Sequence, residues 1–226
     1  DRLQVPQGRV MEKFRHIDTW LFDLDNTLYD AEAEVFTRVG DRMTEFVTRH
    51  LNVSPEEANL LRKDYWKKHG TTLRGLMIEH GVDAHGFLAH VHDIDISDVA
   101  LCPVTQDGLA RLPGRKIVFT NAPRAFAERM IGHLGIGHHF EQLFAIEDAA
   151  FLPKPHPDTY RTVVQKFGIT PAATCMFEDM QINLKPAADL GMTTVWLHGQ
   201  APADHPHVHH KAARLPDWLQ RTIRKD

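Results

Sequence analysis

"TWLFDLDNTLYD", residues 19–30, is the stretch that decides the fold expected of this chain. Its first half is a short apolar run, and only Asp23 and Asp25 interrupt it. A buried strand of a parallel sheet has this nearly continuous apolar character, and its side chains two residues apart point to the same side. Two such carboxylates repel each other unless a cation neutralises them. A turn capped by the side chains of Asp25, Asn26 and Thr27 is the alternative explanation.

Four further apolar runs follow, and helical patterns lie between them. The runs are "KIVFTN" (116–121), "LFAI" (143–146), "TCMFED" (174–179) and "TTVWLH" (193–198). Residues 123–134 and 157–167 place apolar side chains on one helical face and stop at a glycine. This alternation predicts an α/β fold, with a Rossmann-like core in three layers around a central parallel sheet.

Residues 31–102 break the alternation, because only helical patterns occur there. Residues 31–51 carry apolar side chains at helical spacing, and "SPEE" (54–57) is typical of a capping box at a helix start. A strand-to-helix loop usually takes only about 2–6 residues, so this long stretch predicts an inserted helical subdomain. We expect an N-terminal extension over 1–16, an α/β core over 17–29 and 103–226, and a helical cap over 30–102.

Composition and charge exclude several classes of protein. The chain has 226 residues, of which 42% are hydrophobic and 25% charged, and its formal net charge is −4. This balance argues against a nucleic acid polymer or an anionic membrane as partner, and no apolar run reaches the roughly 18–20 residues of a membrane span. The two cysteines, Cys102 and Cys175, form no paired motif and favour a reducing compartment. We expect a cytoplasmic monomer or homodimer.

Sixteen histidines are present, and several gather in "HPHVHHK" at residues 205–211. A histidine-rich tract of this kind can bind a transition metal. No cysteine or acid lies beside it at ligand spacing, so a solvated polar loop is the alternative.

Polar side chains follow three later predicted strands, or the loops that lead on from them. Thr120 and Asn121 begin a helix, where they can hold a phosphate oxygen or simply cap the helix. Lys154 lies between two prolines and can bind phosphate and oppose carboxylates, although a lone lysine is usually a surface charge. Glu178 and Asp179 offer hard oxygen ligands. Ligands bind beyond the carboxyl ends of strands in open α/β sheets, so together these signals favour a phosphate and Mg²⁺ site.

The four motifs, in this order, resemble those of the haloacid dehalogenase superfamily of phosphohydrolases. The matching residues are "DLDNT" (23–27), "TN" (120–121), "KP" (154–155) and "ED" (178–179), and the resemblance extends over about residues 17–197. "FDLDNTLY" (22–29), the cap segment 61–81 and "FEDMQIN" (177–183) are most similar to the pyrimidine 5′-nucleotidase branch. Met180 departs from the pattern, since relatives usually carry a small hydroxyl residue there, and we expect altered packing near the metal.

The resemblance implies a phosphatase that acts on a small phosphorylated metabolite, with a pyrimidine nucleoside 5′-monophosphate as the first candidate. Sugar phosphates and phosphoglycolate are the alternative substrates, and a catalytically silent phosphate-binding protein is an alternative function. Asp23 would attack phosphorus to form an aspartyl-phosphate, and Asp25 would carry the proton. Dehalogenases and ATP-driven pumps of the superfamily lack an acid at the second position, so Asp25 favours a phosphatase.

The resemblance and the chemistry together imply the remaining roles. Mg²⁺ would bind the Asp23 carboxylate, the Asp25 backbone carbonyl and Asp179, and Glu178 would support it from outside the ligand set. The phosphoryl oxygens would be held by Thr120, Asn121 and Lys154.

Substrate choice is expected to come from the cap, which closes over such a site. Candidates for substrate contact are Tyr29, Tyr65, Trp66 and Arg74, which offer rings or a polar head. The alternative for Tyr65 and Trp66 is packing inside the cap, and the alternative for Arg74 is a surface charge.

Overall fold

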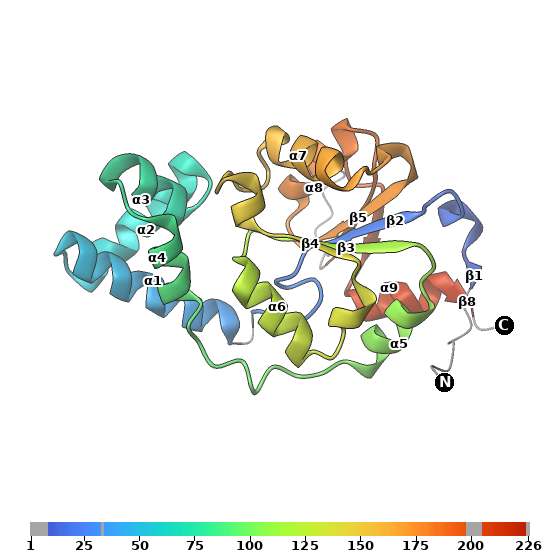
Figure 1. The fold of residues 1–226 in the computed structure, drawn as a ribbon, viewed down its shortest axis with the longest axis horizontal. Coiled ribbons are helices and arrows are strands. Elements are labelled where there is room, and N and C mark those ends of the chain that lie inside the picture. The colour runs from blue at the N-terminus through green and yellow to red at the C-terminus, as the bar shows by residue number, and fades with distance from the viewer. Residues whose placement is uncertain (1–8, 33, 198–204, 225–226) are drawn as a thin grey trace.

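The computed structural model describes residues 9–32, 34–197 and 205–224, and it is built around one sheet of six parallel strands (Figure 1). The strand order is β4-β3-β2-β5-β6-β7. Their bounds are β2 Thr19–Phe22, β3 Arg115–Phe119, β4 Gln142–Phe144, β5 Thr174–Glu178, β6 Thr193–Leu197 and β7 His210–Ala212. The first five lie within or next to the predicted apolar runs, so the predicted α/β fold with a parallel sheet is confirmed. Strand β7 was not predicted, because its residues belong to the histidine-rich segment.

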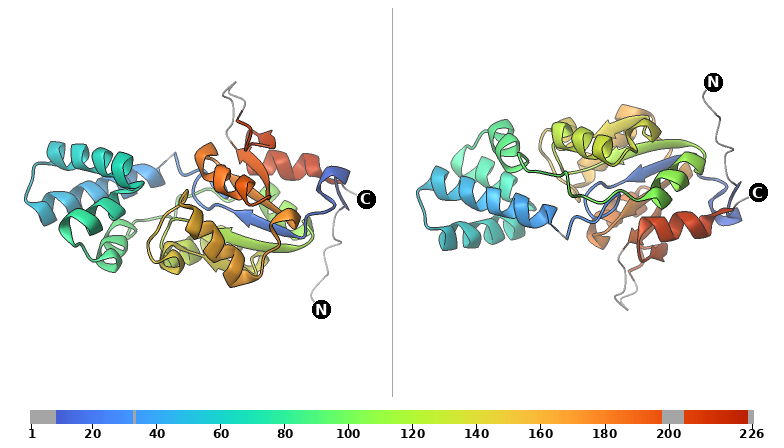
Figure 2. Two further views of the ribbon diagram at one scale, coloured as in Figure 1. Left: turned by 90° about the horizontal axis from the view of Figure 1, so that it is seen from above. Right: turned by 90° about the horizontal axis from the view of Figure 1, so that it is seen from below.

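Helices cover both faces of the sheet and complete the three layers (Figure 2). One face carries α5 (Pro103–Arg111), α6 (Arg124–His133) and α9 (Leu215–Thr222), and the other carries α7 (Pro157–Phe167) and α8 (Gln181–Asp189). The alternation of β2 explains this arrangement, since Trp20 and Phe22 pack with the first group of helices and Leu21 packs with the second.

Four helices stand apart from the sheet at one end of the molecule (Figures 1 and 2). They are α1 (Val35–Leu51), α2 (Pro55–His69), α3 (Thr72–His80) and α4 (Ala84–Val91), and we call them the helical lobe. The predicted capping box begins α2: Ser54 Oγ accepts a hydrogen bond from the Glu57 amide, and the Glu57 carboxylate accepts one from the Ser54 amide. All four helices fall within residues 30–102, and the domain boundaries themselves stay a prediction.

Short elements bring the two ends of the described chain together. Strand β1 (Arg9–Val10) pairs antiparallel with β8 (Ile223–Arg224). The buried ring of Phe14 lies 5.2 Å from the ring of Trp218, centroid to centroid, and so ties this end to the core. The 3₁₀-helices are η1 Glu12–Phe14, η2 Gly137–His139, η3 Ile146–Ala149 and η4 Pro171–Ala173.

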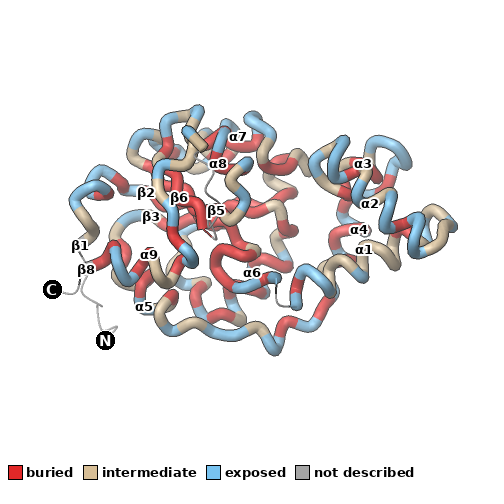
Figure 3. Tube along the Cα trace, turned by 180° about the vertical axis from the view of Figure 1, so that it is seen from behind, coloured by how far each residue is buried: buried red, intermediate tan, exposed pale blue. Residues whose placement is uncertain are grey.

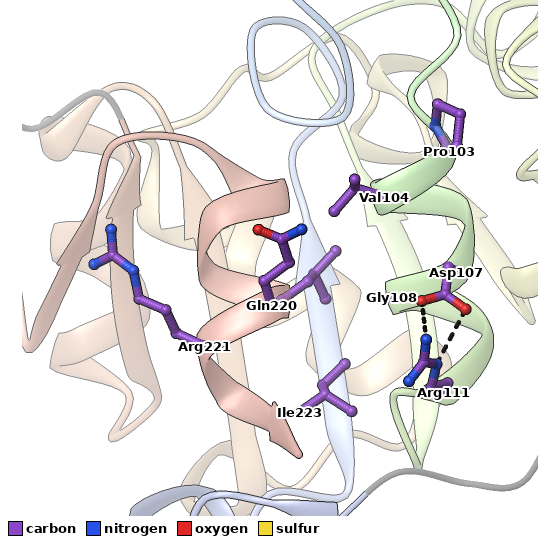
Figure 4. Close-up of a pocket in the computed structure, with 9 residues that line it drawn as sticks. Pro103, Val104, Asp107, Gly108, Arg111, Gln220, Arg221 and Ile223 are labelled. Atoms are coloured by element: carbon purple, nitrogen blue, oxygen red, sulfur yellow. Dashed lines mark hydrogen bonds and ion pairs between the residues drawn. The ribbon is translucent and has the colours of Figure 1, made fainter. Parts of the chain in front are cut away.

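Helices α5 and α9 pack closely because Gly108 has no side chain. A Cβ atom at Gly108 would lie 2.8 Å from Cβ of Leu219, which is too close for two carbon atoms. A hollow of about 700 Å³ remains beside this contact, and the ion pair between Asp107 and Arg111 lies on its wall (Figure 4). None of the helices in the described residues is both long and apolar enough to pass through a membrane.

The register of the central strands decides where the polar residues gather. Phe22 pairs with Val118 on one side and with Phe177 on the other, so β2, β3 and β5 end at the same edge. The strands are buried along nearly their whole length, as the tube coloured by burial shows (Figure 3). Asp23 follows β2 directly, and its amide donates to the Phe177 carbonyl at 3.1 Å. The residues after each of these strands therefore meet at one edge.

Candidate active site

Lys154 is the centre of the site at the carboxyl edge of the sheet. Its Nζ lies 2.9 Å from Asp23 Oδ1, 2.8 Å from Glu178 Oε1 and 2.9 Å from the Phe119 carbonyl oxygen. The Lys154 side chain is almost fully buried. Burial lowers the pKa of Lys154, but Asp23 and Glu178 outweigh this effect and the pKa is raised, so the group stays charged. One cation therefore connects the ends of β2, β3 and β5.

Asn121 holds the loop that carries this lysine. Its Oδ1 accepts from the Lys154 amide at 2.8 Å, and its Nδ2 donates to the Lys154 carbonyl at 3.3 Å. The neighbouring Thr120 Oγ1 accepts from the Ala122 amide at 2.9 Å, as the side chain in a turn does. Both residues lie at the predicted edge. The phosphate contacts expected of them stay predictions.

Asp25 is held by a neighbour on its own loop, because the Tyr29 hydroxyl donates to Asp25 Oδ1. Burial raises the pKa of Asp25, and the hydrogen bond from Tyr29 acts in the opposite direction. Burial and the nearby Asp25 also raise the pKa of Tyr29, so the phenol keeps its proton and remains a donor. The turn between them needs the left-handed conformation at Asn26, with φ of 60°, which asparagine tolerates well.

Asp179 lies at the end of β5 and is held at two points. Its Oδ2 accepts from Asn26 Nδ2 at 3.2 Å, and its backbone carbonyl accepts from Trp196 Nε1 at 2.7 Å. Glu178 beside it accepts from Asn183 Nδ2 at 2.8 Å. Asn26, Asn183 and Trp196 were not named as site residues from the sequence. The sequence signal for Asn26 was its place directly after Asp25, in "DNT". The signal for Asn183 was its place at the end of "FEDMQIN" (177–183).

Three acids gather around this edge, and they fit a divalent cation. Ligand oxygens of Asp23, Glu178 and Asp179 lie within 4.8 Å of one another, and this is the only such group of His, Cys, Asp or Glu among the described residues. Burial, followed by the charge of Glu178, raises the pKa of Asp23 well above its usual range and that of Asp179 to about 7. One lysine does not balance the three acids, of which Asp23 and Glu178 are buried and Asp179 is partly exposed. Hard carboxylate oxygens with surplus negative charge are the donor set that Mg²⁺ prefers.

A cavity of about 190 Å³ opens beside Asp25, between the helical lobe and the sheet. Phe87 from α4 and Phe151 from the loop before Lys154 both line it. Phe151 and its neighbour Ala150 have φ of 62° and 49°, a left-handed conformation that costs about 1–3 kcal/mol per residue without glycine. The other residues that line the cavity are Met43, Thr71, Thr72, Leu73, Leu88, His92, Asn121, Ala122 and Ile146.

The four candidates for substrate contact lie in different surroundings. Tyr29 contacts Asp25, whereas Tyr65 is buried in the core of the helical lobe and its hydroxyl pairs with His80 Nε2. Trp66 is 55% exposed, and neither it nor the partly exposed Arg74 lines the cavity beside Asp25. Contact of these four side chains with substrate stays a prediction. The side chain of Met180, at the position that departs from the family pattern, is exposed.

Two histidines of the segment 205–211 connect it to β6 and α8. His209 Nδ1 accepts from the Thr194 amide at 3.1 Å, and His207 Nε2 lies 2.6 Å from Gln181 Oε1. Among the described residues, these histidines do not belong to a group of side chains that could hold a metal ion. Cys102 and Cys175 are both free thiols, and burial raises the pKa of the Cys175 thiol well above its usual range.

Comparison with known proteins agrees with this geometry. The chain is 33% identical over 78 residues to the fructose-1-phosphate phosphatase of Escherichia coli, which covers 34% of this chain and 41% of that protein. It is 25% identical over 191 residues to phosphate metabolism protein 8 of Saccharomyces cerevisiae, which covers 76% of this chain and 59% of that protein. The chain thus spans less than two thirds of either relative.

A solved structure and a family model complete the comparison. The HAD phosphatase of Thermococcus onnurineus superposes with a TM-score of 0.65 at 16% identity, over 91% of this chain and 97% of that one, and so shares the fold. The family model for haloacid dehalogenase-like hydrolases matches residues 17–191, which include every acid of the site. The chain therefore belongs to the haloacid dehalogenase-like hydrolases.

Proposed function

We propose that the protein is a Mg²⁺-dependent phosphomonoesterase that hydrolyses a small phosphorylated metabolite. The contact of Lys154 with both Asp23 and Glu178 supports this most directly. It supports Asp23 as the nucleophile and Lys154 as a fixed cation, because both lie at one edge of the sheet with the acid group and Asp25. A purely structural role would not require two buried acids on one lysine with a third acid beside them, since buried charges are costly unless balanced.

The reaction would run in two steps. An Asp23 carboxylate oxygen attacks phosphorus, the ester oxygen leaves, and Asp25 gives it a proton, which yields an aspartyl-phosphate and the free alcohol. A water then attacks the same phosphorus and gives its proton to Asp25, which releases phosphate and restores Asp23. Tyr29 would keep one oxygen of Asp25 occupied, so that the other faces the reacting group.

The cation site would be formed by Asp23, Asp179 and the Asp25 backbone carbonyl, with Glu178 close by. When bound, Mg²⁺ would offset the negative charge of the phosphate and the acids. Lys154 would remain on the Asp23 carboxylate and meet a phosphoryl oxygen, together with Thr120 and the Asn121 amide. The hydrogen bonds of Asn26 and Trp196 would hold Asp179 in place.

For the substrate we place sugar phosphates or phosphoglycolate first. The cavity beside Asp25 measures about 190 Å³, whereas a water takes up about 30 Å³ in the liquid, so it holds a leaving group about as large as a small sugar. The similarity to a fructose-1-phosphate phosphatase supports the same class. This reverses the order expected from the sequence. A pyrimidine nucleoside monophosphate is the second candidate, favoured by Phe87 and Phe151, whose rings could stack on a base.

Phosphate release from a panel of phosphomonoesters, with and without Mg²⁺, tests the proposal. The panel should contain fructose 1-phosphate, phosphoglycolate, UMP and CMP. We expect turnover that needs Mg²⁺ and falls at least about 10³-fold in Asp23→Asn, because loss of the nucleophile removes the chemical step. The control is Asp189→Asn, which neutralises an exposed acid paired with Lys185.

Two results would decide against parts of the proposal. A wild-type protein with no more hydrolysis than Asp23→Asn would end the enzyme hypothesis and leave a phosphate-binding protein. Turnover of UMP and CMP well above the sugar phosphates would restore the nucleotide as the first substrate candidate.

A further inference from the structure

A second hollow lies next to the cavity beside Asp25, on the helical lobe. It has a volume of about 530 Å³, and Met43, Thr71 and Thr72 line both spaces. The rest of its lining comes from α2, namely Asn59, Arg62, Lys63, Trp66 and Lys67. We call this hollow the α2 groove. Because the two spaces share three lining residues, the groove lies next to the cavity.

The spacing of the α2 residues sets the direction of the groove. Positions 59, 62, 63, 66 and 67 recur every three or four residues and therefore lie on one helix face. A helix rises about 1.5 Å per residue, so Lys63 and Lys67 lie about 6 Å apart along the axis of α2. Lys67 is the nearer of the two to the end of the helix, after which the chain leads to Thr71 and Thr72.

Three side chains along this face are free to meet a ligand, whereas Asn59 and Arg62 form hydrogen bonds within the lobe. Trp66 is 55% exposed, and Lys63 and Lys67 are both exposed. Within the described chain neither of these lysines forms an ion pair, whereas Lys68 on the same helix pairs with Asp64 at 2.7 Å. Packing of the lobe does not explain why a tryptophan stands at position 66, because the adjacent Tyr65 is the residue that packs in the core. Two unpaired cations beside an exposed ring attract a group of negative charge.

We propose that the α2 groove binds the far end of the leaving group, and that the preferred substrate carries a second anionic group there, as a bisphosphorylated metabolite does. This rests on the proposed function, since the reacting phosphate must lie at Asp23. Lys67 and Lys63 would hold the second anionic group, and the Trp66 ring would pack against the carbon skeleton between the two ends. Arg62 has a different task, because its Nη1 donates to the Gly40 carbonyl at 2.7 Å.

Selectivity between two matched substrates tests this proposal. We would measure kcat/KM with Mg²⁺ for fructose 1,6-bisphosphate and fructose 1-phosphate in wild type, Lys63→Gln/Lys67→Gln and the control Lys68→Gln. Wild type should prefer the bisphosphate, and the double variant should lower the ratio of the two kcat/KM values about tenfold, since two charge-assisted contacts are lost. Lys68→Gln should leave the ratio unchanged. An equal ratio in all three proteins, or a wild-type preference for the monophosphate, would overturn the proposal.

A binding measurement separates this proposal from the proposed function. In EDTA the proposed reaction does not run, and tryptophan fluorescence then reports binding of the same two sugars alone. The groove predicts tighter binding of the bisphosphate to wild type and loss of that difference in Lys63→Gln/Lys67→Gln. If neither sugar is hydrolysed but this difference is seen, the proposed function fails and the groove stands. Equal binding of both sugars to wild type contradicts the groove, whatever the turnover.

Discussion

Lys154 is the residue on which the site depends for both charge and stability. It is 3% exposed and lies between Asp23 and Glu178, so its removal leaves two acids buried without their cation. We expect Lys154→Met to lower the free energy of unfolding by about 3–5 kcal/mol in chelator, because breaking a buried pair leaves an uncompensated charge. Urea denaturation measures this. Adding Glu178→Gln should restore part of the loss, and a single variant as stable as wild type would disprove the assigned charge balance.

Tyr29 is the residue through which Asp25 is oriented. Loss of its hydroxyl in Tyr29→Phe removes a hydrogen bond to a carboxylate, and we expect kcat for an alkyl phosphate to fall about tenfold. p-Nitrophenol leaves readily without a proton, so the defect should be much smaller for p-nitrophenyl phosphate. Steady-state kinetics on both substrates checks this. An equal loss on the two would argue that Tyr29 supports the fold and not proton transfer.

At the residue scale the sequence predicted which polar side chains meet, but not how they are held. Asp23, Lys154, Glu178 and Asp179 follow apolar runs or lie in a nearby loop, and the register of parallel strands brings such positions to one edge. The contact of Tyr29 with Asp25 depends on a left-handed turn, and no periodicity reveals a turn of that kind.

At the scale of elements, β6 supports the proposed cation site through Trp196. This side chain lies beside Glu178 in the paired strand and donates to the Asp179 carbonyl. Outer partners of this kind typically change metal affinity by about 10–100-fold, so we expect Trp196→Phe to weaken Mg²⁺ binding about tenfold in calorimetry. Trp218→Phe is the matched control, since Trp218 packs on Phe177 without contacting Asp179. Equal weakening in both variants would indicate general loosening of the core.

The end of α4 meets α6 through His92, and this contact should depend on pH. The His92 ring lies 4.9 Å from the ring of Phe126, and burial lowers its pKa to about 4 from the usual 6.5. The unfolded chain then binds more protons than the folded protein, so stability is lost as pH falls from about 6.5 towards 4. The pKa shift corresponds to a loss of about 3 kcal/mol in the free energy of unfolding. Partial exposure of His92 reduces this loss to about 2 kcal/mol.

His92→Gln isolates this effect from the other titrating groups. The difference in unfolding free energy between wild type and the variant should shrink by about 2 kcal/mol from pH 7 to pH 4 in urea denaturation. A difference that stays constant over this range would show that His92 does not titrate as assigned.

The elements also show where sequence patterns stop being informative. Strands β2 to β6 and the capping box of α2 were predicted because each signal is local. Strand β7 was missed because its three residues lie among histidines and gain their order from pairing with β6. Helix α5 has few apolar positions of its own. Its place in the fold depends on the close approach of Leu219 to Gly108, which is a tertiary contact.

At the scale of the whole molecule, a helical lobe stands over the edge of a sheet where the acids meet (Figures 1 and 2). The sequence predicted both parts, because the long helical stretch interrupts an otherwise regular alternation. It did not predict the cavity between them, since the lining side chains come from α1, α3, α4, η3 and five loops, and their relative placement is a tertiary property.

The central claim is that Asp23 forms a covalent acyl phosphate, the aspartyl-phosphate, and trapping that intermediate tests it most directly. Enzyme with Mg²⁺ and substrate would be quenched in acid and treated with borohydride, which reduces an aspartyl-phosphate to homoserine, and residue 23 would be read by peptide mass spectrometry. We predict homoserine at position 23 in wild type and none in Asp23→Asn. Continued turnover with no modified residue, or with the modification at another position, would contradict the claim.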